Sequence, residues 1–329
     1  MTIAWRPTAE LGSLHLRAAV LARVREFFTA RAVLEVETPI LVNHPVTDPN
    51  LQSVELPSPI ETMQGPMFLQ TSPEYAMKRL LASGSGDIYQ VCKVFRASER
   101  GRLHNPEFTL IEWYRLGLTL EGLMAEVAAL TLAILATALP EDSPGRGCEY
   151  LSYQEALQHH AGIDPLSCDA RELAIAASAA GLSFESIAAS TRDDLLDFLV
   201  SRCVGPRLGH GRLTFLHRYP RSQAALARVD PTDPRVALRF ELYADGIELA
   251  NGFHELADAA EQRARFATDL LARARLGLPT HPVDEALLAA LQHGLPDCCG
   301  VAVGLDRVLM VASGAQHIDA VLALPMERA

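Results

Sequence analysis

The segment from Gly246 to Glu255 places two carboxylates and an amide on a short stretch that otherwise has the composition of a strand. Its polar residues are Glu248, Asn251 and Glu255, and alternating apolar residues precede them. Buried carboxylates destabilise a fold unless a cation or several hydrogen-bond donors meet them. The segment is therefore a poor candidate for a plain core strand. It predicts a surface that faces a ligand, either a cationic molecule, a bound metal ion, or both.

A hairpin is predicted just before this segment, because Asp245-Gly246 is a typical tight-turn pair. Glu241 and Glu248 lie seven positions apart, so on one continuous strand they would point to opposite faces. A hairpin would bring their carboxylates together. Mg²⁺ prefers a few carboxylates combined with phosphate oxygens, so this pair is a candidate metal site. The alternative is two exposed glutamates at a sheet edge.

The composition describes a globular chain with a large core. Of 329 residues, 49% are hydrophobic and 21% are charged, which disfavours global disorder. The net charge of −11 disfavours a bulk nucleic-acid binder, which usually has a basic face. The six cysteines have no zinc-like spacing and predict reduced thiols in the cytoplasm.

No segment predicts a membrane association. Residues 1–6 contain no apolar signal core. The longest apolar stretch, residues 123–139, includes Glu126 and is short for a span of about 20 residues, so we expect a buried helix there.

The order of elements predicts an α+β fold, an antiparallel sheet flanked by helices, because helices and strands mix without βαβ regularity. Two strands, 88–95 and 108–114, should form a long hairpin around the polar loop 96–107. Residues 40–66 are expected to form loop or edge-strand material. We expect helices at 13–31, 74–81, 120–130, 152–160, 169–180, 191–203, 257–276, 283–293 and 305–313, and further strands at 33–39, 67–72, 213–217, 236–250 and 300–304.

Two arginines are candidate phosphate ligands. Arg96 ends a predicted strand, where its guanidinium could bind a phosphate with two parallel hydrogen bonds; the alternative is a solvated basic loop. Arg307 follows Gly304 at a strand-to-helix junction, and a helix N-terminus favours an anion. The alternative for Arg307 is an exposed ion pair with Asp306.

Three further side chains could add polar contacts to a pocket. They are Ser72, Glu74 and Tyr114. Taken singly, these residues favour structural roles: Ser72 as a helix cap, Glu74 as a partner of the helix dipole, and Tyr114 as a core aromatic residue.

Taken together, these residues resemble a known family. Phe95-Arg96 followed by His104-Asn-Pro-Glu-Phe108 is similar to the second motif of the class II aminoacyl-tRNA synthetases, in its lysine-type version. Gly300-Val-Ala-Val-Gly-Leu-Asp-Arg307 is similar to the third motif, and Glu35-Val-Glu-Thr-Pro39 to the end of the first. The segment 248–255 resembles the lysine-binding segment of that family. The resemblance covers about residues 13–313 and implies the class II antiparallel sheet.

The layout differs from a tRNA-charging lysyl enzyme in one large feature. The pattern begins at about residue 13, which leaves no room for the N-terminal barrel that reads the anticodon. We therefore expect a single catalytic domain over 1–329, with a helical insertion at about 140–235. The stand-alone group with this layout ligates lysine to elongation factor P, and the segments Thr71–Leu80, Glu112–Arg115 and Ser222–Ala224 resemble that group. Ala302 stands where tRNA-charging relatives usually have glycine, and its methyl group would reshape the amino-acid pocket toward β-lysine.

The resemblance implies a role for each matching residue. Arg96 and Arg307 would be catalytic and bind the ATP phosphates, and Glu241 and Glu248 would hold Mg²⁺. The amino acid would be bound by Ser72, Glu74, Tyr114, Asn251, Glu255 and Ala302. The ATP site would also include Ser98, Glu99, Asn105, Glu248, Leu249 and Gly304. The usual Arg-Asn-Glu of the second motif is Arg96-Ala97-Ser98-Glu99 here, so Glu99 is the candidate for the adenine contact.

The implied activity is ATP-dependent activation of (R)-β-lysine or lysine and its ligation to a lysine of elongation factor P. The first motif implies a homodimer, and neither a tRNA partner nor a membrane is expected. A minimal enzyme that aminoacylates tRNA or another small acceptor is the first alternative. A catalytically inactive regulator is the second, supported only by Ala97-Ser98.

Overall fold

The computed structural model describes residues 5–58, 65–138 and 146–329. The chain forms two compact units. The first comprises Met1–Leu118, Ala133–Pro140 and Leu256–Ala329, and the second Thr119–Leu132 and Glu141–Glu255. The division falls within helix α3 (Leu120–Leu135). That residues 1–329 act as a single catalytic domain stays a prediction.

The first unit contains four neighbouring strands in the order β1-β5-β6-β11. β5 (Ile88–Phe95) and β6 (Glu107–Leu116) form the predicted antiparallel hairpin, with Phe95 opposite Glu107 at its loop end. β11 (Cys298–Gly304) pairs with β6 in antiparallel register, whereas β1 (Leu34–Glu35) runs parallel to β5 at the edge. A second, small antiparallel sheet contains β2 (Leu41–Val42), β4 (Met67–Leu69) and β3 (Val54–Leu56).

Helix α1 (Leu11–Thr29) packs on this sheet through aromatic side chains. The ring of Phe28 stacks on Tyr89 of β5 at 4.2 Å and meets the edge of Trp113 of β6 at 5.2 Å. All three rings are fully buried, and such aromatic pairs stabilise a core beyond their buried area. The other helices of this unit are α2 (Glu74–Ala82), α8 (Ala259–Arg275), α9 (Glu285–Gly294) and α10 (Leu305–Ser313).

A buried carboxylate fixes the start of α10. Asp306 accepts a hydrogen bond from the backbone N–H of Thr109 at 2.7 Å and is paired with Arg17 of α1. The sequence-based alternative of a pair between Asp306 and Arg307 is therefore wrong. The carboxylate of Asp306 is turned into the core because α1 and β6 both supply donors there.

The second unit is built on the strand order β10-β9-β8-β7. β9 (Val236–Ala244) and β10 (Ile247–His254) form a hairpin, so the single strand expected at 236–250 is wrong, while the Asp245-Gly246 turn is confirmed. Both turn residues have positive φ, 50° and 74°, as in a type I′ turn. β8 (Arg212–Pro220) pairs antiparallel with β9, and β7 (Gly147–Ser152) pairs parallel with β8.

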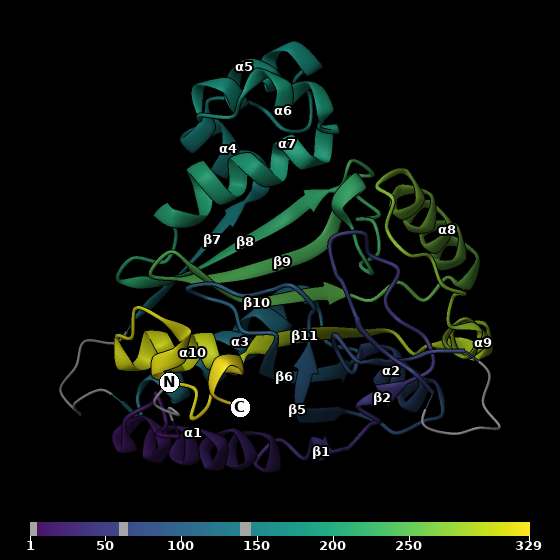
Figure 1. The fold of residues 1–329 in the computed structure, drawn as a ribbon. Coiled ribbons are helices and arrows are strands. Elements are labelled where there is room, and N and C mark those ends of the chain that lie inside the picture. The colour runs from purple at the N-terminus through teal and green to yellow at the C-terminus, as the bar shows by residue number, and fades with distance from the viewer. Residues whose placement is uncertain (1–4, 59–64, 139–145) are drawn as a thin grey trace. The chain divides into compact units, whose positions relative to one another are not determined.

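Four helices gather beyond β7 and β8 in this unit (Figure 1). They are α4 (Tyr153–Ala161), α5 (Ala170–Ala179), α6 (Phe184–Ala189) and α7 (Arg192–Leu199), and a π-helical turn continues α7 through Val204. Capping boxes begin three of them, from Ser152, Asp169 and Thr191. Their apolar faces form one core with Leu216 and Tyr219 of β8.

The structure confirms most of the expected elements. Both strands of the central hairpin and every expected helix are present within a few residues. Strand β7 and helix α6 were missed, because β7 is a half-exposed edge strand without clear alternation and α6 has six residues and no buried side chain. The short strands β2 and β3 lie in the region 40–66 that was expected as loop or edge strand, and β4 lies within the strand expected at 67–72. Residues 59–64 lie outside the described ranges. The start of the expected insertion, near residue 140, also lies outside them.

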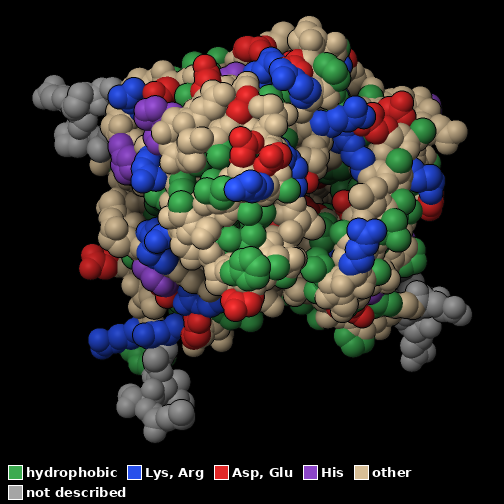
Figure 2. Space-filling model, turned by 90° about the horizontal axis from the view of Figure 1, so that it is seen from above, with side chains coloured by type: hydrophobic (Ala, Val, Ile, Leu, Met, Phe, Trp, Pro, Cys, Tyr) green, Lys and Arg blue, Asp and Glu red, His purple; other side chains and the backbone are tan. Residues whose placement is uncertain are grey.

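The described surface carries mixed charge. Acidic and basic side chains are interspersed on the face drawn in Figure 2. Within residues 5–58, 65–138 and 146–329, no helix is both long and apolar enough to cross a bilayer.

A glycine on β10 is required by close packing. Gly252 lies opposite Phe240 of β9, and a Cβ at this glycine would stand 2.4 Å from the Phe240 ring. Phe240 is fully buried, so its ring has little room to retreat. The position of β10, and with it that of the neighbouring Asn251, therefore depends on the lack of a side chain at Gly252.

Gly252→Ala should lower the free energy of unfolding by about 1–3 kcal/mol, because overpacking must displace the Phe240 ring or the strand. Thermal or urea unfolding measures this loss. Gly147→Ala is the matched control, since a Cβ at Gly147 on β7 meets nothing within 4 Å. Equal stability of the two variants would contradict the packing argument.

Candidate active site

The structure brings the two predicted phosphate-binding arginines onto one polar network. Arg96 Nη1 lies 3.8 Å from Glu99, and the second carboxylate oxygen of Glu99 lies 4.0 Å from His104. His104 Nε2 in turn accepts a hydrogen bond from Arg307 Nη2 at 2.7 Å. Arg96 and Arg307 come from strand and helix ends that are 211 positions apart in sequence, yet both border the loop 96–107. Two guanidinium groups near one loop give a positive surface suited to a polyphosphate.

The imidazole of His104 acts as an acceptor in this network. Partial burial lowers the pKa of His104, and the positive charges of Arg307 and Arg96 lower it further, while Glu99 opposes them. A neutral ring has one lone pair available for the Arg307 N–H, and a protonated ring has none. The position of Arg307 therefore depends on His104 staying neutral.

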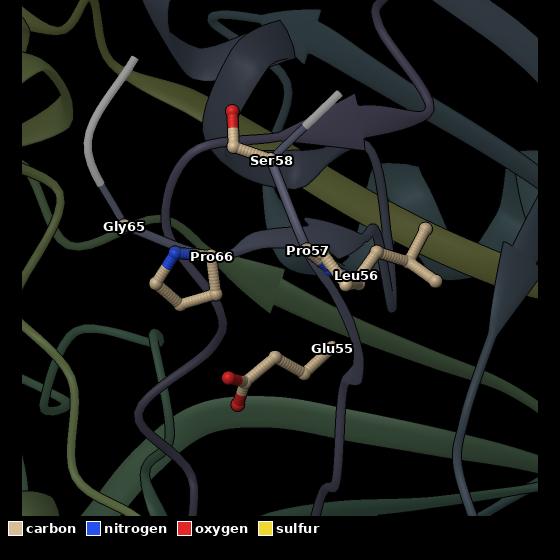
Figure 3. A pocket seen from close by; sticks show the side chains of 6 residues that line it. All are labelled: Glu55, Leu56, Pro57, Ser58, Gly65 and Pro66. Atoms are coloured by element: carbon tan, nitrogen blue, oxygen red, sulfur yellow. The ribbon is translucent and has the colours of Figure 1, made fainter. Parts of the chain in front are cut away.

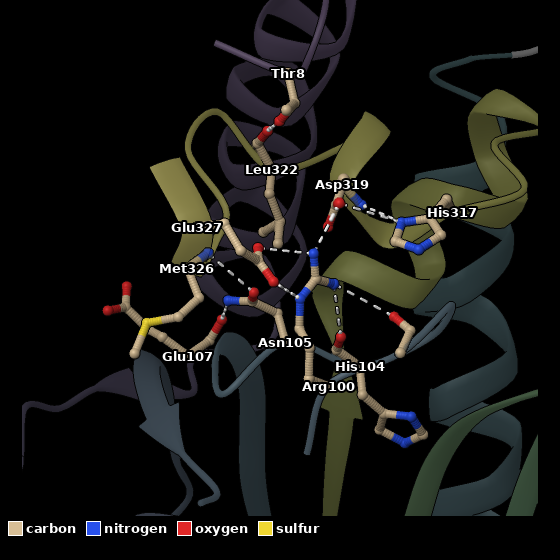
Figure 4. A network of polar contacts seen from close by, with 11 residues as sticks. Thr8, Arg100, His104, Asn105, Glu107, His317, Asp319, Leu322, Met326 and Glu327 are labelled. Carbon is tan, nitrogen blue, oxygen red and sulfur yellow. Dashed lines mark hydrogen bonds and ion pairs between the residues drawn. The ribbon is translucent and has the colours of Figure 1, made fainter. Parts of the chain in front are cut away.

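The loop 96–107 is also tied to the C-terminal segment (Figure 4). Arg100 forms a bidentate pair with Glu327, at 2.6 and 2.9 Å, and a further bond to Asp319 at 2.9 Å. The side chain of Asn105 donates to the carbonyl of Glu107 at 2.7 Å and accepts from the backbone N–H of Met326 at 3.2 Å. Asn105 is buried and has this structural role; its contact with ATP stays a prediction.

Ser98 and Gly304 frame the same region by their backbone geometry. Ser98 is exposed and has a φ of 66°, which is uncommon for a residue with a Cβ. Gly304 is the N-cap residue of α10, and it has no side chain that could accept a hydrogen bond from the first turn of the helix. The leading N–H groups of α10 thus begin beside Arg307, in the orientation that favours an anion.

A second polar cluster in the same unit is organised by Glu112, a residue that the sequence interpretation did not select. Glu112 is only 2% exposed and accepts hydrogen bonds from Ser72 and from the Tyr114 hydroxyl, both at 2.8 Å. Ala302 of β11 is the direct cross-strand neighbour of Glu112. The signal that could have found Glu112 is its place inside the apolar run of β6, where a lone carboxylate needs partners.

Glu74 lies next to this cluster. Its backbone N–H donates to the Ser72 hydroxyl at 3.0 Å, but Pro73 rather than Ser72 is the N-cap of α2, so the expected cap at Ser72 is wrong. The carboxylate of Glu74 accepts a hydrogen bond from the buried amine of Lys78 at 2.6 Å. This pair explains how α2 can hold a lysine in the core without an uncompensated charge.

The acidic hairpin of the second unit places its polar side chains on one face. The register pairs Glu248 with Tyr243 and Asn251 with Glu241, so the two glutamates are diagonal rather than direct neighbours. A bulge at Leu249 makes this possible, because without the extra residue positions 248 and 251 would point to opposite faces. The hairpin thus places Glu241 and Glu248 on the same side of the sheet, and the expectation that their carboxylates come together at one metal ion stays a prediction.

Glu241 has defined partners in this unit. Arg239 Nη2 donates to one of its oxygens at 2.6 Å and the Tyr243 hydroxyl to the other at 2.8 Å. Glu255, directly after β10, is only 4% exposed, and its backbone forms a bridge with Ala227. A carboxylate at this depth strongly favours a cation as its neighbour.

The candidate Mg²⁺ site consists of two carboxylates, those of Glu241 and Glu248. Among the residues that the structure describes, no group of three or more His, Cys, Asp or Glu side chains could hold a metal ion. Glu241 and Glu248 lie on one face, and a carboxylate oxygen that accepts one hydrogen bond retains a lone pair. Two carboxylates completed by phosphate oxygens and water match the preference of Mg²⁺.

A surface pocket of about 360 Å³ lies elsewhere in the first unit (Figure 3). Its lining residues flank positions 59–64, and none of the predicted site residues is among them. They are Glu55, Leu56, Pro57, Ser58, Gly65 and Pro66.

The whole chain matches one protein family. The model described as tRNA synthetases class II (D, K and N) covers residues 3–328, and the chain belongs to this family. The expected α+β class is thereby confirmed, together with the antiparallel pairs β5–β6 and β9–β10.

Individual relatives are similar over their full length. The "Elongation factor P--(R)-beta-lysine ligase" of Klebsiella pneumoniae (strain 342) is 49% identical over 330 residues, which cover 100% of this chain and 99% of the relative. The protein of the same name from Vibrio cholerae serotype O1 is 47% identical over 327 residues, covering 99% and 98%. That of Salmonella paratyphi B is 47% identical over 330 residues, covering 100% and 99%.

The pKa of His104, measured by NMR titration, should lie below its ordinary value near 6.5. It should rise part of the way back in Arg307→Met, because burial, the larger cause, remains. The folded state binds fewer protons than the unfolded state here, so this group's contribution to stability is present above about pH 6.5 and is lost as pH falls. Loss of one resonance in His104→Gln assigns the signal among the 11 histidines. An unchanged pKa in Arg307→Met would contradict the contact.

Proposed function

We propose that this protein activates (R)-β-lysine with ATP and ligates it to a lysine side chain of elongation factor P. The observation that carries the proposal is the near-complete, 47–49% identical alignment with ligases of that name in a chain of the class II synthetase family. The residues that such a reaction would use belong to the three groups described above, namely the Arg96–Arg307 network, the cluster around Glu112 and the acidic hairpin.

The first step joins the amino acid to AMP. A carboxylate oxygen of the amino acid attacks the α-phosphorus of ATP, and pyrophosphate leaves. Arg96 would neutralise the charge that develops on the α-phosphate, and Arg307, oriented by His104, would bind the far end of the triphosphate. Catalysis would depend on positioning and electrostatic stabilisation, as for phosphoryl chemistry in general.

Glu241 and Glu248 would hold Mg²⁺, which supplies positive charge to the phosphates when bound. Arg239 and Tyr243 keep Glu241 in place without using all of its lone pairs. Leu249 would contribute backbone at the nucleotide, where the bulge alters the course of β10.

Recognition of the amino acid would use both of its ends, the distal ammonium group and the end that carries the reacting carboxylate. The motif resemblance assigns Glu255 and Tyr114 to the distal ammonium group, and Ser72, Glu74 and Asn251 to the reacting end. The methyl group of Ala302, beside Glu112, would narrow the pocket in the way expected for a preference for β-lysine.

The second step transfers the activated acyl group. The ε-amine of a lysine on elongation factor P, after losing a proton, attacks the carbonyl carbon of the adenylate. An amide bond forms, and the bond to AMP breaks. Neither step requires a tRNA.

Incubation with ATP, (R)-β-lysine and elongation factor P should increase the mass of the factor by one aminoacyl group, measured by intact-protein mass spectrometry. ATP–pyrophosphate exchange measured in parallel reports the first step alone. Exchange without any mass shift would refute the acceptor, and charging of tRNA instead would establish the minimal synthetase alternative.

Glu255→Gln provides the site control for this experiment. Removing the charge while keeping the shape should reduce amino-acid-dependent exchange by about 100-fold or more, since the ammonium would lose its buried counter-charge. Glu261→Gln on α8 is the matched control, because Glu261 pairs with Arg265 at a partly exposed helix surface. Equal exchange in both variants would remove Glu255 from the site.

The proposal includes a homodimer in the cytoplasm. Three apolar side chains in the N-terminal part of the chain are exposed: Leu11 on α1, Leu34 on β1 and Ile40 just before β2. Burying such residues against a second copy is a favourable use of apolar surface. The six cysteines are free thiols, as expected in a reducing compartment.

Sedimentation equilibrium should give the mass of two chains for the wild-type protein, and the mass of one chain for Leu34→Glu. A monomeric wild-type protein would refute the dimer.

A further inference from the structure

Arg239 of β9 donates hydrogen bonds to three different residues of the second unit, and the sequence interpretation gave it no role. Its Nε donates to Asn251 Oδ1 at 3.1 Å, its Nη2 to Glu241 at 2.6 Å, and its Nη1 to the carbonyl of Gln223 at 2.8 Å. The guanidinium also lies over the ring of Tyr219, 4.2 Å from its centroid. The side chain is 17% exposed, so these contacts form with little competition from water.

The contact with Asn251 determines which end of that amide is available to a ligand. An arginine side chain has only donors, so the carboxamide oxygen of Asn251 must face Arg239. The NH₂ group is then turned away from Arg239. Asn251 can consequently offer donors to a ligand, which suits a carboxylate or acyl oxygen and does not suit an ammonium group.

Arg239 is itself anchored to the helical part of the unit. The carbonyl that it binds belongs to Gln223, whose side-chain amide donates to Asp197 of α7 at 2.8 Å. The preceding Ser222 donates to Asp193 of the same helix at 2.7 Å. A continuous chain of hydrogen bonds thus runs from α7 through Gln223 to Arg239.

We propose that Arg239 is a positioning residue that turns the NH₂ group of Asn251 toward the amino-acid carboxylate, with Gln223 and α7 holding the guanidinium in place. This inference rests on the proposed function for the identity of the ligand. The orientation of the amide does not depend on that function and can be tested without any substrate.

Asparagine-selective ¹⁵N labelling tests the orientation directly, because the chain contains four asparagines, at positions 43, 50, 105 and 251. In ligand-free protein the NH₂ resonances of Asn251, assigned by their loss in Asn251→Asp, should shift and exchange faster with water in Arg239→Met. Arg239→Lys keeps the charge but has one ammonium for three acceptors, so it should restore them only in part. Arg235→Met is the control, since Arg235 binds Asp233 at the surface. Unchanged Asn251 resonances in folded Arg239→Met would overturn the proposal.

A double-mutant cycle tests the functional role by amino-acid-dependent pyrophosphate exchange. Asn251→Ala alone should lower kcat/KM for the amino acid by about 10- to 100-fold, mainly through KM. In the Arg239→Met background the same change should cost less than about threefold, because the amide is no longer oriented. Equal losses in both backgrounds would overturn the positioning role.

The two tests separate this inference from the proposed function. Absence of pyrophosphate exchange in the wild-type protein would count against the proposed function. The amide orientation would then be tested by the NMR experiment alone. Normal exchange with additive losses would count against Arg239 alone.

Discussion

The β-bulge at Leu249 determines which side chains of the β9–β10 hairpin share a face. A regular strand would send Glu248 and Asn251 to opposite sides, because side chains alternate with a period of two. With one extra residue, both lie on the face of Glu241, where Arg239 can reach Glu241 and Asn251. The polar chemistry of the second unit depends on this single irregularity. Independently, the same hairpin needs a glycine at 252 to admit the Phe240 ring.

Buried carboxylates in both units are stabilised by partners that are distant in sequence. Asp306 meets Arg17 and the Thr109 N–H, Glu112 meets Ser72 and Tyr114, and Glu241 meets Arg239 and Tyr243. Each cluster replaces the lost hydration of a carboxylate by defined donors, which costs little once the fold has placed them. Two of these clusters also contain side chains that the proposed reaction would use, namely Ser72, Tyr114 and Glu241, so their contacts would serve both stability and preorganisation.

The loop 96–107 combines an exposed residue near its start with anchoring from its middle onward. Asn105 and Arg100 bind the C-terminal segment, whereas Ser98 is exposed with a strained backbone. Strain of this kind persists where the surroundings hold it in place. A loop built in this way can keep Arg96 near Arg307 through Glu99 and His104 and still admit a nucleotide.

The sequence by itself determined the α+β class, the central hairpin, the Asp245-Gly246 turn and the family, because periodicity, turn residues and motif spacing are local properties. It also selected Arg96, Arg307 and Glu255, whose residue types are unusual for their segments. Only the tertiary structure decided the partner of Asp306, the central place of Glu112 and the role of Arg239. Those roles arise from donors and acceptors that meet across strands and helices, and strand register, including the bulge, is set by packing over the whole sheet rather than by neighbours in sequence.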